Sequence, residues 1–324
     1  MTKERSRGEK RKRYALLKRI IRISLTASIV LFLAVFFAFV PFRLLLPAYK
    51  ITRREEGELR LHFLDLVGGV TIVEFPDGEA LVINAGEGLF AEDNTLCRYL
   101  RGLHLTSVSV LSTSSKSSHI GGMPALFEVF SVTKTYLPAL AAETGSYNRF
   151  LSAVQKEGCQ TERLCRYGVI ENSSGAYAVC LSPYSEEQEG VTAEECSTVL
   201  YLSYEGVGIV LAGDITQKRE NQLVKEYESS NTIFDSGQYR VALEDTQILC
   251  ASSHGSDSGS GDNWLSTLRP SATVICCNKD QGPSDNALAR IAQYSQTIYR
   301  TDELGEVMIT IKNGSFEVET HVVK

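Results

Sequence analysis

The sequence predicts an α/β (α+β) domain, in which two sheets are flanked by helices, preceded by one N-terminal transmembrane helix. Three observations predict this arrangement: a charge-free apolar run near the N-terminus, a meander of short strands after it, and a long region in which strand and helix patterns alternate. The chain has 324 residues, of which 43% are hydrophobic, so it can bury a core of that kind.

Residues 1–22 form a strongly basic tail, which we expect to remain in the cytoplasm. Residues 23–42 carry no charged side chain, and 20 helical residues at about 1.5 Å each span a hydrocarbon core of about 30 Å. Because positive charge beside an apolar segment resists translocation, the long C-terminal part is expected outside the cell membrane. The sequence therefore predicts a single-pass protein with an uncleaved anchor over residues 23–47 and a charged stalk over residues 48–58. A cleaved signal peptide is the alternative.

The charge of the chain divides at this predicted anchor. Residues 1–54 hold 14 of the 33 Lys and Arg but only 2 of the 39 Asp and Glu. This leaves 19 basic and 37 acidic side chains beyond residue 54, a net charge of about −18. Such a surface repels a phosphate backbone, whereas nucleic-acid binding depends on basic residues that release counterions. The charge therefore argues against nucleic acid as a partner.

Residues 59–324 are predicted to form one extracytoplasmic domain that opens as an antiparallel meander. Its first strands are expected at Leu59–Leu66, Val70–Phe75 and Ala80–Asn84, separated by glycine and proline turns. Later strands are expected at Val108–Leu111, Thr133–Leu137, Tyr177–Leu181, Val199–Tyr204, Val207–Leu211, Gln247–Ala251, Thr273–Cys277, Gln296–Tyr299, Glu306–Ile311 and Phe316–Thr320. Helices are expected at Thr95–Leu103, Tyr147–Lys156, Gln217–Tyr227, Trp264–Leu268 and Asn286–Tyr294.

The eight cysteines form no C-x-x-C pair, which argues against a structural zinc site built from thiolates. Disulfides stay open at this point. Cys276 and Cys277 end an apolar strand pattern, and adjacent strand residues point to opposite faces. At least one of the two is therefore expected in a core.

Six short motifs occur in an order that resembles one protein family. The run LHFLDLVGGVTIVEFPDG (61–78) is similar to HFLDVGQGDAILIEFPDG, with one residue fewer. The segments LVINAG (81–86), SHIGGM (118–123), LAGDI (211–215), SSHGS (252–256) and YRTD (299–302) resemble LLIDAG, DHIGGL, LTGDI, VxHHGS and YRTD. Together they identify a resemblance to the metallo-β-lactamase superfamily, and within it to the C-terminal hydrolase domain of ComEC-type competence proteins. The resemblance implies an αββα sandwich with a two-metal site at the edge of its sheets.

Most of the metal ligands that the family implies are replaced here. In the family, two cations lower the pKa of a bound water and clamp the attacked group. The family's first-metal histidines correspond to Ser114, Lys116 and Ser182, and its second-metal aspartate to Ser118. The positions implied for the former metal site are Ser114, Lys116, Ser118, His119, Ser182, Asp214, Ser253 and His254. Hydroxyls and an ammonium do not replace imidazoles as zinc ligands, so a dinuclear centre is not expected.

Two interpretations of the surviving residues remain open. In the first, Lys116 lies where the first metal would be and pairs with Asp214, and the site holds no cofactor. In the second, His119, Asp214 and His254 hold one zinc or other divalent metal. Asp214 is also placed to cap the helix expected after it.

The sequence therefore favours a membrane-anchored, non-catalytic binding or scaffold module whose partner is an envelope protein or ligand. The alternative is a mononuclear metal-dependent hydrolase that acts on a phosphoester or similar envelope substrate. DNA uptake has less support, because the domain is acidic and one predicted span makes no channel.

The predicted topology can be tested on intact cells. Added protease is expected to digest the chain beyond Lys50, because the basic tail should hold the N-terminus inside. Protection of the C-terminal domain in intact cells, with digestion only after lysis, would contradict the prediction.

Overall fold

The computed structural model describes residues 18–19, 21–32, 51, 53–88, 95–184, 191–280 and 282–321. The chain divides into two compact units, residues 1–49 and 50–324. In the first unit, residues 18–19 and 21–32 are helical. Within the described positions, no helix has both the length and the apolarity to cross a membrane. Residues 1–17 of the predicted tail and 33–47 of the predicted anchor lie outside the described residues, so the transmembrane helix stays a prediction.

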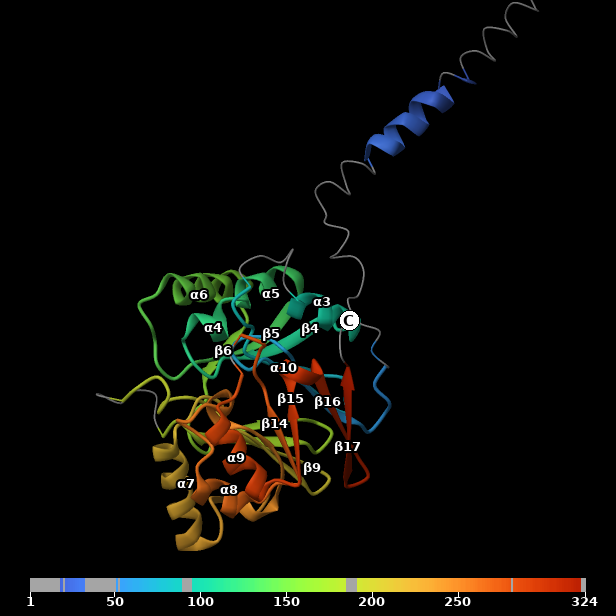
Figure 1. The fold of residues 1–324 in the computed structure, drawn as a ribbon. Coiled ribbons are helices and arrows are strands. Elements are labelled where there is room, and N and C mark those ends of the chain that lie inside the picture. The colour runs from blue at the N-terminus through green and yellow to red at the C-terminus, as the bar shows by residue number, and fades with distance from the viewer. Residues whose placement is uncertain are drawn as a thin grey trace, which may run out of the picture. The chain divides into compact units, whose positions relative to one another are not determined.

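The second unit contains two large sheets that face each other (Figure 1). The first sheet has the order β17-β16-β1-β2-β3-β4-β5-β6, with β1 Leu59–Phe63, β2 Thr71–Glu74, β3 Ala80–Ile83, β4 Ser107–Leu111, β5 Ser131–Leu137, β6 Gln160–Arg163, β16 Glu306–Lys312 and β17 Ser315–His321. The second has the order β15-β14-β13-β10-β9-β8-β7, with β7 Val169–Glu171, β8 Tyr177–Ser182, β9 Val199–Tyr204, β10 Val207–Leu211, β13 Thr246–Cys250, β14 Ala272–Ile275 and β15 Thr297–Arg300. A small hairpin joins β11 Phe234–Asp235 to β12 Arg240–Val241.

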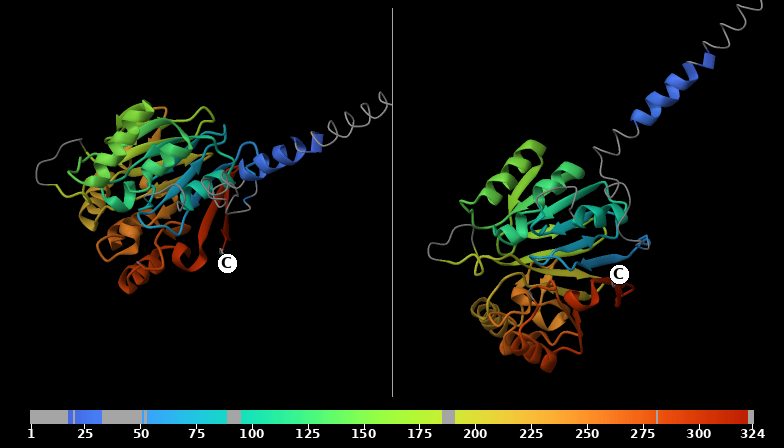
Figure 2. Two further views of the ribbon diagram at one scale, coloured as in Figure 1. Left: turned by 90° about the horizontal axis from the view of Figure 1, so that it is seen from above. Right: turned by 45° about the horizontal axis from the view of Figure 1, so that its top comes forward.

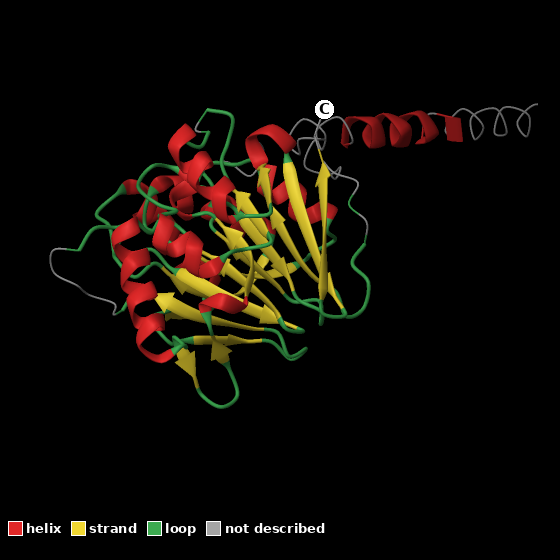
Figure 3. Cartoon of the chain, turned by 60° about the horizontal axis from the view of Figure 1, so that its bottom comes forward, coloured by secondary structure: helices red, strands yellow, loops and turns green. Residues whose placement is uncertain are grey.

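Helices cover the outer face of each sheet, so the unit has four layers (Figures 2 and 3). The first sheet carries α3 Thr95–Gly102, α4 Ser117–Ile120, α5 Met123–Val129 and α6 Gly145–Glu157. The second carries α7 Gln217–Ser230, α8 Asp262–Leu268 and α9 Asp285–Tyr294, while the short α10 Thr301–Leu304 follows β15. Local sequence sets the ends of α6, because Thr144 accepts a hydrogen bond from the Tyr147 amide and Gly158 adopts a left-handed φ of 71°.

The two cores follow from alternation along the strands. Leu59, Leu61 and Phe63 of β1 point between the sheets, where they join Leu200 and Leu202 of β9. The other face of β9 and its neighbours packs under α7 and α8, with the fully buried Trp264 in that layer. Burying one such side chain contributes about 1.5–3 kcal/mol. Both faces of the second sheet are thus apolar, which requires a sheet on one side and helices on the other.

Within residues 59–324, each strand and helix that the sequence predicts has a counterpart, with ends that shift by a few residues. The differences lie in short elements. No helix is predicted between residues 104 and 146, but α4 begins at Ser117, and α5 follows it. Serine favours local side-chain bonds over helix, so only the tertiary packing of α4 reveals it. Strands β6 and β7 lie at sheet edges, where half-exposed residues give little periodic signal.

No disulfide joins any of the eight cysteines within the described residues. Cys276 lies in the core between the sheets and Cys277 in the core beneath the helices, as the strand pattern predicted.

A buried ionic network lies on the helix-covered face of the first sheet. His62 of β1 is fully buried, with Nε2 2.8 Å from Glu74 Oε2 on β2. Its Nδ1 lies 2.8 Å from the Tyr99 hydroxyl of α3 and 3.2 Å from Glu306 Oε1 on β16. Burial alone would lower the pKa of His62, but hydrogen bonds to Glu306 and Glu74 and their charges raise it above its usual value. This role of His62 could not be predicted from the sequence, because its partners come from three other elements.

We expect His62 to make folding stability depend on pH. Because its folded pKa is raised, the stabilisation is fully present below about 6.5 and is lost as the pH rises through the folded pKa. His62→Gln is expected to cost about 3–5 kcal/mol, because it leaves two buried glutamates without their cation. It should also flatten the decline of the unfolding free energy above pH 6.5, measured by urea titration at several pH values. An unchanged pH slope in the variant would contradict this role.

Candidate functional site

The motif residues meet at one edge of the sandwich because of strand direction. Strands β3 and β4 run parallel in the first sheet, and β10 and β13 run parallel in the second. Asn84 follows β3, Asp214 follows β10 and His254 follows β13. The carboxyl ends of parallel strands lie at the same sheet edge, so loops distant in sequence come together there.

Three potential ligand atoms converge at this edge. Asp214 Oδ1 lies 3.0 Å from His254 Nε2 and 3.3 Å from His119 Nε2. The ligand atoms of these three residues all lie within 4.8 Å of one another. Asp214 Oδ1 and His119 Nε2 are buried, and neither makes a well-directed hydrogen bond among the described residues despite these short distances. The ligand atoms of the three side chains therefore converge on a common point without forming well-directed hydrogen bonds to one another.

Lys116 binds the other oxygen of the same carboxylate. Its Nζ lies 2.9 Å from Asp214 Oδ2 and 2.7 Å from Glu194 Oε1. The predicted contact between Lys116 and Asp214 is thus present. Glu194 is a partner that the sequence did not indicate, because it lies in no motif. Burial alone would lower the pKa of Lys116, but the two carboxylates raise it, and the bond from Lys116 lowers the pKa of Glu194.

The protonation of His254 follows from its two neighbours. Its Nδ1 lies 2.9 Å from the Cys276 carbonyl oxygen, which only accepts, so Nδ1 carries a proton. Its Nε2 faces the Asp214 carboxylate, which favours a second proton there. Burial would lower the pKa of His254, but Asp214 raises it. For Asp214 itself burial opposes ionisation, yet the two histidines lower its pKa well below the usual range.

The serines at the ligand positions that the family implies differ in their hydrogen bonds. Ser118 Oγ lies 3.0 Å from His119 Nδ1, and Ser253 Oγ donates to the carbonyls of Asp214 and Ile215, both at 3.0 Å. Ser114 Oγ accepts only a long bond, 3.4 Å, from the Lys116 amide. Ser182 is buried, and its hydroxyl has no hydrogen-bond partner among the described residues. The structure therefore links Ser118 and Ser253 to the three ligand-type residues but shows no such link for Ser182.

Two further residues hold the loops in place. Asn84, where the family has aspartate, donates to the Gly68 carbonyl at 2.8 Å and accepts from the Thr113 amide at 2.9 Å. Ser197 Oγ accepts from the Asp214 amide at 2.9 Å. The sequence suggested that Asp214 caps α7, but this is wrong. Thr216 occupies the N-cap position, and the Asp214 side chain faces the histidines instead.

The space beside the site is small. A cavity of about 30 Å³ is lined by Asp214, His254, Asn84 and Thr113 among others. That is room for roughly one water molecule. This cavity can hold a small ion or a water molecule beside the carboxylate.

Comparison with known proteins places this geometry in context. No family model matches the chain. ComE operon protein 3 of Bacillus subtilis (strain 168) is 22% identical over 215 residues, which is 65% of this chain and 26% of that protein. The match therefore spans about a quarter of the relative's length.

Solved structures with a related fold also match. The metallo-β-lactamase fold protein YhfI from Bacillus subtilis aligns with 81% of this chain and 100% of its own, with a TM-score of 0.46 and 9% identity. CmlA, a diiron β-hydroxylase from Streptomyces venezuelae, aligns with 83% of this chain and 55% of its own, with a TM-score of 0.48 and 9% identity. Scores this low carry no argument about activity.

The observed two-sheet sandwich is consistent with the metallo-β-lactamase fold, and the match to ComE operon protein 3 supports the relationship to ComEC-type proteins that the motifs indicated.

Proposed function

We propose that residues 59–324 form a non-catalytic binding or scaffold module in which an ion-pair network has replaced the dinuclear metal centre of related hydrolases. The observation that carries this proposal is the position of the Lys116 ammonium, bound to Asp214 at 2.9 Å and to Glu194 at 2.7 Å. The proposed partner is an envelope protein or ligand, which an anchor over residues 23–47 would keep at the membrane.

Charge balance supports the proposal. Asp214 and Glu194 contribute two negative charges, and Lys116 with a protonated His254 contributes two positive charges. The buried carboxylate is thus neutralised without any bound cation. An unpaired buried carboxylate would cost several kcal/mol, so such compensation is what a site without its metals requires.

The same ammonium disfavours a metal at the first position. Two unit charges about 4 Å apart interact with about 4 kcal/mol at an effective dielectric constant of about 20. A dication beside Lys116 would meet about twice that repulsion, reduced by solvent because the lysine side chain is 37% exposed. Serine hydroxyls stand at positions where the family has histidine ligands, and hydroxyls are poor ligands for zinc.

A second candidate function is a mononuclear metal-dependent hydrolase, with a phosphoester or similar envelope substrate. It is favoured by the convergence of His119, Asp214 and His254 within 4.8 Å around buried atoms without well-directed bonds. The Nδ1 proton of His254 on the Cys276 carbonyl also leaves Nε2 as the ligand atom, the usual arrangement for a metal-bound histidine. A metal there would act as a Lewis acid on a bound water.

Metal analysis of the purified chain separates the two candidates. The non-catalytic module is expected to contain well below one equivalent of divalent metal and to unfold at the same temperature with or without a chelator. A hydrolase would contain close to one equivalent and would lose stability on chelation, because a ligand that binds only the folded state stabilises it. A near-stoichiometric metal in the wild-type chain that His254→Ala abolishes would contradict the non-catalytic proposal.

The role of Lys116 can be measured by a double-mutant cycle. Lys116→Ala is expected to destabilise the fold because it leaves Asp214 without its ammonium. Adding Asp214→Asn should recover much of that loss, with a coupling energy of about 1 kcal/mol from denaturant unfolding. Lys134→Ala is a matched control, because Lys134 pairs with Glu162 on another face. Additive effects of Lys116→Ala and Asp214→Asn would refute the proposed compensation.

A further inference from the structure

A hollow of about 580 Å³ lies along one side of α7 and shares no lining residue with the histidine and Asp214 site. Lys218, Gln222 and Lys225 line it from one face of the helix, because residues four and seven positions apart fall on the same side. The backbones of the two lysines are separated by about 10.5 Å of helix, so their long side chains can reach one ligand from both ends. Three cations and two carboxylates, Glu195 and Glu226, line the hollow, which is a local excess of positive charge in a domain whose net charge is about −18.

Arg219 places a buried cation in the same hollow. The residue is only 6% exposed, and its Nε and Nη2 donate to the Glu195 carbonyl at 3.2 and 3.0 Å. Its guanidinium also lies 4.3 Å from the ring centre of Tyr184. No carboxylate pairs with Arg219 among the described residues, and its Nη1 makes no hydrogen bond to them. A buried cation without a counter-ion is costly, so this guanidinium is suited to an anion from outside.

The carboxylates nearby already have partners. Glu226 is bound by Arg166 through both oxygens and accepts from the Tyr184 hydroxyl at 2.6 Å. The Glu195 side chain pairs with Lys218. Lys225 is exposed and forms no ion pair within the described part of the chain. Within the described residues, Arg219 and Lys225 are therefore positive charges without a carboxylate partner, and both line this hollow.

We propose that this hollow binds a small ligand through a phosphate group, held by Arg219 and Lys225. A planar guanidinium and an ammonium group together match a phosphate, which offers three oxygens and up to two charges, better than they match a single carboxylate. The remaining volume, beside Tyr184 and Val191, would take the organic part of the ligand. This hollow shares no lining residue with the cavity beside Asp214. The phosphate proposal therefore does not depend on whether His119, Asp214 and His254 bind a metal.

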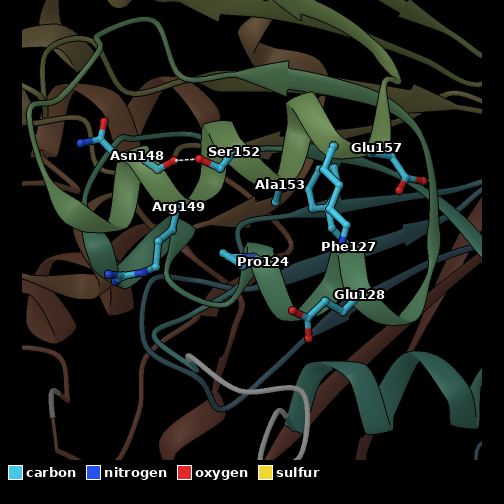
Figure 4. A pocket seen from close by; sticks show the side chains of 9 residues that line it. Pro124, Phe127, Glu128, Asn148, Arg149, Ser152, Ala153 and Glu157 are labelled. Carbon is cyan, nitrogen blue, oxygen red and sulfur yellow. Dashed lines mark hydrogen bonds between the residues drawn. The ribbon is translucent and has the colours of Figure 1, made fainter.

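A second hollow supplies the control. It lies between α5 and α6, has a volume of about 450 Å³, and is lined by Phe127, Glu128 and Arg149 (Figure 4). Lys156 lines it too and, like Lys225, is an exposed helix lysine without an ion pair among the described residues. Two cations and two carboxylates line this hollow, which leaves no excess of positive charge, so we assign it no ligand. Lys156→Gln then reports the effect of removing one surface charge anywhere on the domain.

The test is a calorimetric titration of the full-length chain in detergent with inorganic phosphate, and separately with acetate, at constant ionic strength. We expect saturable binding of phosphate and much weaker binding of acetate. Lys225→Gln should weaken phosphate binding roughly threefold to tenfold, and Arg219→Lys at least as much, because charged hydrogen bonds are lost. Lys156→Gln should leave binding unchanged. If Arg219→Lys fails to fold, Lys225→Gln still decides the matter. Absence of saturable phosphate binding, equal affinity for acetate, or equal weakening by Lys156→Gln and Lys225→Gln would overturn the proposal.

Discussion

The arrangement of the site depends on one constraint, which is the need to neutralise the carboxylate of Asp214. The fold buries this side chain at the edge where parallel strands of both sheets end, and only 5% of the residue is exposed. In a metalloenzyme the cations would supply the charge. Here Lys116 approaches one oxygen and two histidines approach the other. The backbone of Asp214 is held independently, because its amide donates to Ser197 and its carbonyl accepts from Ser253.

The residues at the positions that the family resemblance implies differ in how firmly the fold holds them. Asp214 lies in a tight turn after β10, where its amide and its carbonyl are both hydrogen-bonded. His254 anchors its loop to the Cys276 carbonyl on the neighbouring strand segment. The Ser114 hydroxyl accepts one long hydrogen bond, and the Ser182 hydroxyl has no hydrogen-bond partner among the described residues.

The sequence predicted the layered fold well because its strands and helices have strong periodic patterns. The runs at Val199–Tyr204 and Val207–Leu211 match β9 and β10 to the residue. It could not predict α4, because a serine-rich stretch carries no helical pattern, nor the edge strands β6 and β7. In the site, the family resemblance implied that Lys116 and Asp214 would meet, because the family aims both positions at one metal centre. Glu194 could not be predicted, because it lies outside every motif and reaches the site only through tertiary packing. The partners of His62 were hidden for the same reason.

The central claim is that an ammonium has taken the place of the first metal. It is tested most directly by a crystal structure of the protein grown with zinc, with diffraction measured on both sides of the zinc absorption edge. The account predicts Lys116 in contact with Asp214 and Glu194, and no zinc peak on the Lys116 side of the Asp214 carboxylate. A zinc peak bonded to the Asp214 oxygen that Lys116 now contacts, with the lysine displaced, would contradict it.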